Sequence, residues 1–277
     1  MIPTFLLMLR EGLEAALIVG VLAAYLVRIG RRDALPKVWA GVGSALALSV
    51  AVGLLLVVTI GQLPAAVQET VEGLSGLLAV AVLTWMLFWM RRQGRLLKGE
   101  LEQGLHVALS AGSTTAIVGL AFIAVAREGL ETVLFLVAVI SSAGAGLATA
   151  TGALAGLAMA VAIGGAIFLG GIRANLRWFF TVTGTMLIFV AAGLVSFSIH
   201  EFGESGLIAN TGVAFNLGAV LPETGPLGSV LAGLFGYRSS PTPLELIGYL
   251  AYLGPVLALF VFDERLPMRR GRAAAEA

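Results

Sequence analysis

The stretches "LREGLEAALIVG" (Leu9 to Gly20) and "AREGLETVLFLV" (Ala126 to Val137) contain the same five letters, R-E-G-L-E, inside otherwise apolar runs. Each run carries one arginine and two glutamates among side chains typical of a membrane interior. Ionised groups are costly in a bilayer, and where they occur they pair with one another or mark a pathway for ions or protons. The repeated motif is therefore the feature from which fold and function are interpreted.

The composition of the chain is that of an integral membrane protein. Of its 277 residues, 58% are hydrophobic and only 12% are charged, whereas a soluble domain carries about 25% charged residues. Several apolar runs reach the ~20 residues that a helix needs to cross the hydrocarbon core. They lack the period-two alternation of a membrane β-barrel and are too long for its strands. We therefore expect an all-α membrane protein.

Seven apolar segments are predicted to cross the membrane as helices. They lie at about 3–28, 38–60, 69–90, 110–140, 150–172, 178–199 and 244–262. A secretory signal would need a basic start, and here the basic cluster follows the first apolar run, so we expect that run to be retained. The chain contains 36 glycines, which let helices approach closely in lipid. We expect one transmembrane domain over residues 1–265 and a short basic cytoplasmic tail at 266–277.

The basic residues of the loops predict the orientation, because Lys and Arg are concentrated in cytoplasmic loops. They follow the first, third, fifth and seventh spans, at Arg28, Arg31, Arg32, Lys37, Arg91, Arg92, Arg95, Lys98, Arg173, Arg177, Arg265, Arg269, Arg270 and Arg272. Of the remaining basic residues, Arg10 and Arg127 belong to the motifs and only Arg238 lies in the opposite loops. We expect a multi-pass protein of the plasma membrane with the N-terminus outside and the C-terminus inside.

The positions of the two motifs predict two halves of opposite orientation. The motifs lie in the first and fourth spans, so the helices that carry them cross the membrane in opposite directions. Such segments are typical of an inverted-topology repeat, whose shared site lies near the bilayer midplane. We expect the halves at about 1–98 and 107–199, with the helix at about 244–262 as an addition.

Two connections are longer than the others. The inner segment 91–106 mixes charges of both signs and is expected to be amphipathic and solvated. The outer segment 200–243 contains the apolar run "LGSVLAGLFGY" (Leu227 to Tyr237), which is too short to span and is expected at the membrane interface or dipping into it. Three tryptophans are expected to anchor helices at the interface: Trp85, Trp89 and Trp178.

Each motif places two carboxylates on one face of its helix. Glu11 and Glu14 are three residues apart, as are Glu128 and Glu131, and residues at this spacing are neighbours on a helix surface. Because ionised carboxylates facing lipid would be untenable, we expect all four to face one another or a wet cavity. Oxygen ligands in this number suit a hard, multiply charged cation. The chain has no cysteine that could offer a thiolate instead.

The arginines and glycines of the motifs are expected to support this site. Each arginine precedes the second glutamate of its motif by four residues, so Arg10 and Arg127 can each reach that glutamate along the helix. Gly12 and Gly129 remove side-chain bulk, which would let the two motif helices approach each other closely. The alternative is a salt-bridge cluster that only locks the bundle. Two copies in opposed helices favour a transport site, because neutral hydrogen bonds would lock a bundle at lower cost.

The E-x-x-E spacing recurs near the outer ends of two helices, at Glu69/Glu72 and at Glu201/Glu204. We expect these pairs to bind or concentrate cations in an acidic vestibule before they reach the deep site. His200, beside Glu201, would add a nitrogen ligand or simply reach the interface. Ordinary solvation of helix ends is the alternative, because acids in the first turn of a helix also suit the helix dipole.

With its doubled motif, the sequence resembles the oxidase-dependent iron transporter family, which contains fungal high-affinity iron permeases and the bacterial permeases of the elemental iron uptake system. The resemblance extends over essentially the whole chain, including the seven spans and the motifs in spans one and four. "VEGLSGLLAVAVLTWMLFWMRR" (Val71 to Arg92) is also similar to the family's third span, with its glutamate at Glu72. The residues that match the family's iron-translocation motifs are Arg10, Glu11, Glu14, Arg127, Glu128 and Glu131.

The resemblance implies a permease, not an enzyme, with iron as the transported substrate and no permanently bound cofactor. Its partners would be iron ions, membrane lipid and an extracytoplasmic protein that oxidises or delivers iron. In fungal members that protein is a multicopper ferroxidase, and bacterial members work with periplasmic or peroxidase-like proteins. Nucleic acid is not among the expected partners. The oxidation state of the iron stays open, because both Fe²⁺ and Fe³⁺ accept oxygen ligands.

Two other functions are compatible with acids inside a membrane. A di-iron enzyme such as an oxidase uses E-x-x-H pairs, and no glutamate in this chain has a histidine at that spacing. A proton-coupled transporter of another cation would use the acids as a proton relay, a role that the doubled arginines fit less well.

Overall fold

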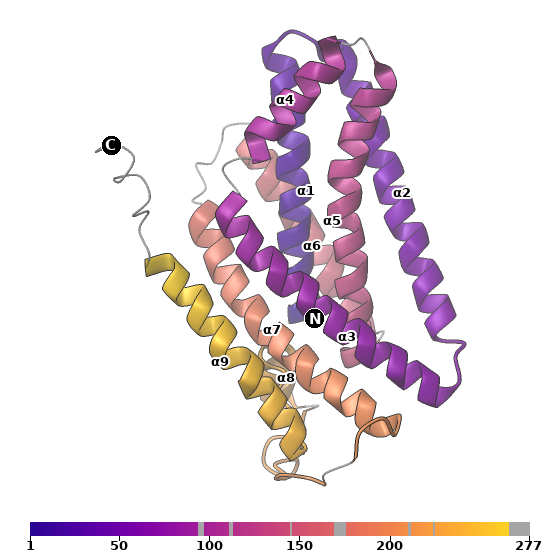
Figure 1. The fold of residues 1–277 in the computed structure, drawn as a ribbon, viewed down its shortest axis with the longest axis vertical. Coiled ribbons are helices and arrows are strands. Elements are labelled where there is room, and N and C mark those ends of the chain that lie inside the picture. Colours follow the sequence, from indigo (N-terminus) through magenta and orange to yellow (C-terminus); the bar gives the residue numbers. More distant parts are fainter. Residues whose placement is uncertain are drawn as a thin grey trace, which may run out of the picture.

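The structure is a computed structural model that describes residues 1–93, 97–110, 113–144, 146–168, 176–209, 212–223 and 225–265. Within these ranges all regular secondary structure is helical (Figure 1). The long helices are α1 (Ile2–Arg28), α2 (Leu35–Ile60), α3 (Ala65–Gln93), α5 (Thr114–Ala143), α6 (Leu147–Phe168), α7 (Leu176–Glu204) and α9 (Pro243–Arg265). The short ones are η1 (Arg32–Ala34), α4 (Leu97–Ser110) and α8 (Pro226–Phe235). The predicted tail at 266–277 and the loop residues Arg95 and Arg173 lie outside the described residues.

In the described parts of the chain, five helices, α2, α3, α6, α7 and α9, are long and apolar enough to cross a membrane. Helices α1 and α5 have the length, 27 and 30 residues, but each carries the three charges of its motif near its centre. The prediction of an all-helical membrane protein is confirmed. Each of the seven predicted ranges overlaps one long helix, while the number of crossings stays a prediction.

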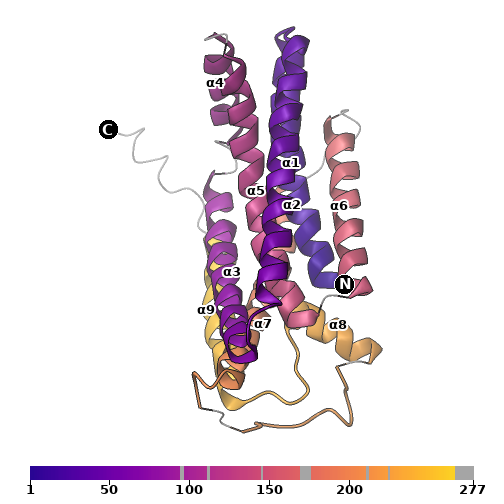
Figure 2. The same cartoon turned by 90° about the vertical axis from the view of Figure 1, so that its right-hand side faces the viewer.

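The long helices pack against partners from distant parts of the chain. α1 lies along α6, α2 along α5, and α3 along α7, which also contacts α9. Figure 1 shows α3, α7 and α9 side by side, with α1, α2 and α5 reaching beyond them towards the top of the view. Figure 2 shows α6 on the side of the molecule opposite to α3 and α9. The two helices with the motifs, α1 and α5, contact each other inside this arrangement.

Two large apolar clusters among the described residues help to hold the bundle together. The first lies where α1, α3, α5 and α7 meet and includes Leu7, Leu83 and Phe135. The second involves the later part of α1, from Ile18 onward, packed against α2, α4 and α5. Van der Waals packing of this kind drives helix association in lipid, where there is little hydrophobic force between helices. The first motif lies between the two clusters, so packing on both sides fixes its position.

The later part of the inner segment 91–106 is amphipathic and packs against the bundle. It belongs to α4, in which Leu101, Leu105 and Ala108 are buried against α1 and α5. Glu100 and Val107 of the same helix are exposed. The apolar side chains at positions i, i+4 and i+7 form a stripe that packs against neighbouring helices, and Glu100 lies exposed, so this helix is amphipathic, as predicted, with its apolar face buried in the bundle.

The motif glycines contact helices other than those predicted. A Cβ at Gly12 would lie 2.9 Å from the Cβ of Ala160 in α6, and a Cβ at Gly129 would collide with the hydroxyl of Ser49 in α2. The prediction that these glycines bring the two motif helices together is therefore wrong. Gly12 permits the close packing of α1 on α6, and Gly129 permits that of α5 on α2.

The apolar run from Leu227 to Tyr237 forms most of α8, which packs against α7 and α1. Its 10 residues are too few to cross a bilayer. The helix ends at Gly236, whose φ of 65° is left-handed and therefore favours glycine. The backbone there approaches Gly193 of α7 so closely that a Cβ on either glycine would collide with the other.

Candidate metal site

The two motifs face each other between antiparallel helices. α1 and α5 are in contact and run in opposite directions (Figure 1). One carboxylate oxygen from each of Glu11, Glu128 and Glu131 lies within 4.8 Å of the other two. Small divalent ions bind carboxylate oxygens at about 2.0–2.2 Å, so two ligands on opposite sides of one ion are at most about 4.4 Å apart. The three oxygens would have to close by only a few tenths of an ångström to share an ion.

These carboxylates are buried and incompletely hydrogen-bonded. Glu11 is 2% exposed and Glu128 is 7% exposed. Within the part of the chain that the structure describes, both oxygens of Glu11 and the Oε2 atoms of Glu128 and Glu131 have no hydrogen-bond partner. Buried polar atoms are nearly always paired in proteins, and an unpaired one indicates a function or a bound water or ion. The oxygens that converge here are thus chemically suited to take up a cation.

Each arginine holds the second glutamate of its own motif. Arg10 Nε donates to Glu14 Oε1 at 3.1 Å, and Arg127 Nε donates to Glu131 Oε1 at 3.0 Å. Both pairs have the i, i+4 geometry expected from the sequence. Two guanidinium groups against four carboxylates leave two negative charges if all six groups are ionised. In that ionised state the site has a net negative charge and attracts cations even after its internal ion pairs are counted.

Glu14 lies at the edge of the converging set. Its carboxylate is not among the three that lie within 4.8 Å of one another, although it is close enough to repel Glu11 and Glu128 electrostatically. The sequence predicted that all four motif glutamates would face one site, and the structure brings three of them together. The E-x-x-E spacing fixes positions within one helix, but the shift of one helix along the other decides which of the four acids meet.

Two tryptophans of α3 lie against the second motif. The guanidinium carbon of Arg127 is 4.3 Å from the ring centroid of Trp89 and 5.5 Å from that of Trp85, and the two rings stack with centroids 5.9 Å apart. In the first motif, Arg10 Nη2 instead donates to Met90 Sδ at 3.5 Å. A cation–π contact contributes about 0.5–2 kcal/mol, depending on exposure. The tryptophans thus help to hold Arg127, a role that the sequence did not suggest.

The outer glutamate pairs belong to α3 and α7, which pack against each other. Glu72 accepts a hydrogen bond from Gln68 Nε2 at 2.8 Å, and Glu69 and Glu72 both repel Glu201 electrostatically. Among the described residues, the deep site is the only place where three metal-ligating side chains converge. The outer acids Glu69, Glu72 and Glu201 therefore form an acidic patch without the geometry of a ligand set.

One buried acid, Glu245, was not predicted from the sequence. Glu245 of α9 is 1% exposed, and its carboxylate is 3.1 Å from His200 Nδ1 and 3.7 Å from Arg238 Nε. Together with Glu204 and His200 it lines a cavity of about 180 Å³. The only sequence signal is the capping-box spacing from Thr242 to Glu245, and Thr242 Oγ1 does accept from the Glu245 backbone N–H at 3.2 Å. That signal indicates the start of a helix, not a buried charge.

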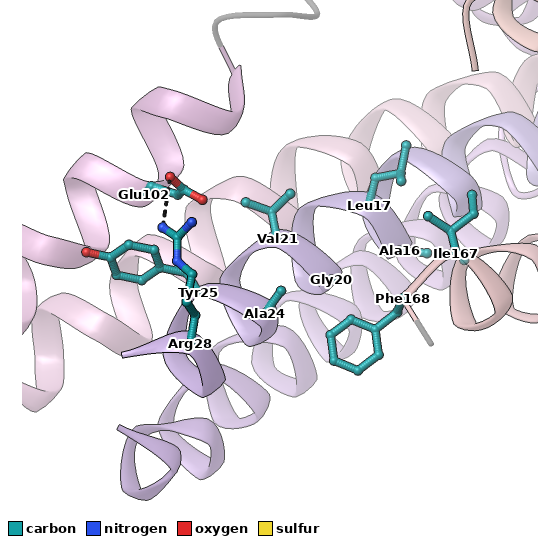
Figure 3. A pocket seen from close by; sticks show the side chains of 11 residues that line it. Ala16, Leu17, Gly20, Val21, Ala24, Tyr25, Arg28, Glu102, Ile167 and Phe168 are labelled. Carbon is teal, nitrogen blue, oxygen red and sulfur yellow. Dashed lines mark ion pairs between the residues drawn. The ribbon is translucent and has the colours of Figure 1, made fainter. Parts of the chain in front are cut away.

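A larger cavity, of about 460 Å³, follows α1 away from the first motif (Figure 3). The residues of α1 that line it are Ala16, Leu17, Gly20, Val21, Ala24, Tyr25 and Arg28. Ile167 and Phe168 of α6 form another wall, and Glu102 of α4 lies at the end near Arg28 (Figure 3). Arg28 Nη2 is 3.5 Å from Glu102 Oε2. The cavity therefore extends from the helical turn after Glu14 to the end of α1.

The comparisons with known proteins agree on one family. The model of the iron permease FTR1 family matches residues 1–269. The chain is 42% identical to the ferrous iron permease EfeU of Escherichia coli strain UTI89 over 280 residues, which cover 100% of both chains. It is also 42% identical to the ferrous iron permease EfeU of Yersinia pestis over 278 residues, which cover 99% of this chain and 98% of the relative. No solved structure matches the chain significantly. The chain therefore belongs to the iron permease FTR1 family, and it is a transporter, not an enzyme.

Proposed function

We propose that this chain carries ferrous iron across the plasma membrane into the cell and that the ion binds between its two R-E-G-L-E motifs. The observation that carries the proposal is the convergence of Glu11, Glu128 and Glu131, whose unpaired oxygens come from two helices of opposite direction. A salt-bridge cluster that only locked the bundle would pair these oxygens with cationic side chains. Ferrous iron is the ion in the names of the relatives, and an all-oxygen ligand set accepts it.

We propose seven crossings, with α1 and α5 as the two that carry the motifs. Charged residues inside a membrane face the interior of the bundle, and the contact between α1 and α5 supports this arrangement. Successive long helices alternate in direction (Figure 1). With the basic loops inside, the N-terminus is outside and the C-terminus inside.

We also propose that residues 1–265 form a single domain built from an inverted repeat, with α9 as an addition. The halves are those expected from the sequence, about 1–98 and 107–199. If α1, α2 and α3 are matched to α5, α6 and α7, the contact of α1 with α6 corresponds to that of α5 with α2. The contact of α1 with α7 then corresponds to that of α5 with α3, and both pairs of contacts are present. This correspondence supports the repeat.

The remaining acids and arginines have supporting roles in the proposal. The acids of the two outer pairs, Glu69, Glu72, Glu201 and Glu204, attract iron to the outer mouth, where a partner protein delivers it. Clefts lined by one sign of charge raise the local concentration of the opposite ion. Arg10 and Arg127 fix the second glutamate of each motif and limit the repulsion among the carboxylates.

Uptake of radioactive iron into proteoliposomes tests the proposal. We expect the wild-type protein to take up Fe²⁺ under anaerobic conditions, and Glu11→Gln and Glu128→Gln to reduce the rate at least tenfold because each removes a converging ligand. Glu100→Gln is the matched control: it removes an exposed carboxylate of α4 and should leave uptake unchanged. Wild-type uptake by Glu11→Gln, or transport of an organic cation that is indifferent to iron, would contradict the proposal.

A further inference from the structure

We propose that the iron ion occupies two positions in succession: an outer one made by Glu11, Glu128 and Glu131, and an inner one in which Glu14 replaces Glu131. Glu11 and Glu128 belong to both positions, so the ion exchanges one ligand and keeps two as it moves inward. This inference rests on the proposed function and assigns different roles to two glutamates that the motif makes equivalent.

The helix directions put the two exchanging glutamates on opposite sides of the shared pair. A helix rises about 1.5 Å per residue, so a glutamate three residues further along lies about 4.5 Å further along the axis. α1 and α5 run in opposite directions (Figure 1). With the N-terminus outside, Glu14 lies inward of Glu11, whereas Glu131 lies outward of Glu128. Since oxygens of Glu11 and Glu128 lie within 4.8 Å of each other, Glu131 lies towards the outer side of this pair and Glu14 towards its inner side.

The second glutamates of the two motifs take different positions, although an inverted repeat would make them equivalent. Glu14 and Glu131 occupy equivalent places in the two motifs and bind their arginines alike, at 3.1 and 3.0 Å. Nevertheless, Glu131 belongs to the converging set and Glu14 does not. In an inverted repeat, alternating access is largely a rocking or gating of one half against the other, and such a movement can exchange the environments of equivalent residues in the two halves. In this protein the exchange would bring Glu14 to Glu11 and Glu128 and move Glu131 away from them. The three carboxylates that then converge form the inner position.

Glu14 lies within electrostatic range of both shared glutamates. It repels Glu11 and Glu128, and a relative movement of α1 and α5 that brings it closer to them would form the inner position. Arg10 is bonded to Oε1 of Glu14, as Arg127 is to Oε1 of Glu131. Each exchanging glutamate therefore stays tied to its own helix while the ion passes between them.

The cavity of about 460 Å³ begins on the inner side of Glu14, where an ion leaving the inner position would go. Its lining starts at Ala16 and Leu17, two and three residues after Glu14, and continues along α1 to Arg28 and Glu102 (Figure 3). Glu131 does not lie next to this lining, because it belongs to the half of α5 that leads outward. The cavity thus supports Glu14 as the last glutamate of the site that the ion meets.

The test compares equilibrium binding with uptake in the full-length protein. Binding of Fe²⁺ is measured anaerobically by equilibrium dialysis of protein in lipid nanodiscs, and uptake is measured in proteoliposomes. We expect Glu131→Gln to weaken binding at least tenfold, since even supporting residues of metal sites contribute about 10–100-fold. We expect Glu14→Gln to keep its Fe²⁺ affinity within about threefold of wild type while its uptake rate falls at least tenfold. Glu14→Asp and Glu131→Asp, which retain the charge, should show the same split in weaker form.

The outcomes separate this inference from the proposed function. If wild-type protein takes up Fe²⁺ and the two glutamine variants lose affinity equally, or Glu14→Gln transports at the wild-type rate, the two-position inference is overturned. If wild-type protein neither binds nor transports Fe²⁺, the proposed function itself fails. Thermal unfolding of each variant identifies any that does not fold, and the aspartate variants then decide the question.

Discussion

Two identical motif residues meet different environments in this protein. Arg10 is 2% exposed, whereas the side chain of Arg127 is 34% exposed and lies over Trp89. Each bonds the glutamate four residues later at nearly the same distance. Removing one member of a buried ion pair leaves an uncompensated charge, whereas the contribution of a pair falls as its exposure to solvent rises. The two arginines should therefore differ in their effect on stability although the motif makes them equivalent.

We predict that Arg10→Met lowers the thermal stability of the protein far more than Arg127→Met does. The loss of a partner from a buried pair costs about 3–5 kcal/mol, and Glu14 would be left without its arginine. Thermal unfolding in detergent measures the effect. The double variant Arg10→Met/Glu14→Gln should recover most of the loss, because it removes both charges. An equal loss in the two single variants would show that burial does not distinguish the arginines.

The glycines of the motifs determine how the helices pack. Gly129 faces Ser49 of α2, and Gly12 faces Ala160 of α6. Small residues at such contacts let helix backbones approach closely. The contacts of α1 with α6 and of α5 with α2 join elements from different halves of the sequence. Each motif thus supplies both the ligands of the candidate site and the contact that positions its helix.

We predict that Gly129→Ala destabilises the protein and reduces iron uptake, because its methyl group would collide with the Ser49 hydroxyl. Adding Ser49→Gly should restore both properties, since it removes the obstructing side chain. Gly119→Ala in the same helix is the control: a Cβ there meets nothing within 4 Å, and alanine favours a helix over glycine. Thermal unfolding and uptake are measured for all variants, and failure of Ser49→Gly to rescue would contradict the contact.

The alternating directions of the long helices give the whole molecule two ends of different character. The end that carries the turn after α1 also carries α4, and the opposite end carries the long segment between α7 and α9 (Figure 1). Basic loop residues follow α1 and α3, and such residues face the cytoplasm. The order of the carboxylates from outside to inside depends on this orientation.

We predict that Val220→Cys reacts with a membrane-impermeant maleimide in intact spheroplasts and that Gly99→Cys reacts only after permeabilisation. Val220 is 84% exposed in the outer segment, and a side chain at Gly99 of α4 would meet nothing within 4 Å. Because the natural chain has no cysteine, each variant reports from one position. The reverse labelling pattern would invert the proposed orientation and with it the roles of Glu14 and Glu131.

The protein class and the local geometry of the motifs could be read from the amino-acid order. Long apolar runs with few charges predicted an all-helical membrane protein, and the four-residue spacing predicted that Arg10 would reach Glu14 and Arg127 would reach Glu131. These features depend on composition and on the helical repeat of 3.6 residues, which act within one segment. They hold wherever that segment lies in the fold.

The assembly of the candidate site depended on contacts between segments. The inclusion of Glu131 but not Glu14, the packing of Gly129 on Ser49 and the burial of Glu245 beside His200 all arise where different helices meet. Such contacts depend on which helices are neighbours and how far each is shifted along the next. Spacing within one helix contains no information about that shift, because it results from the packing of all the side chains between the helices.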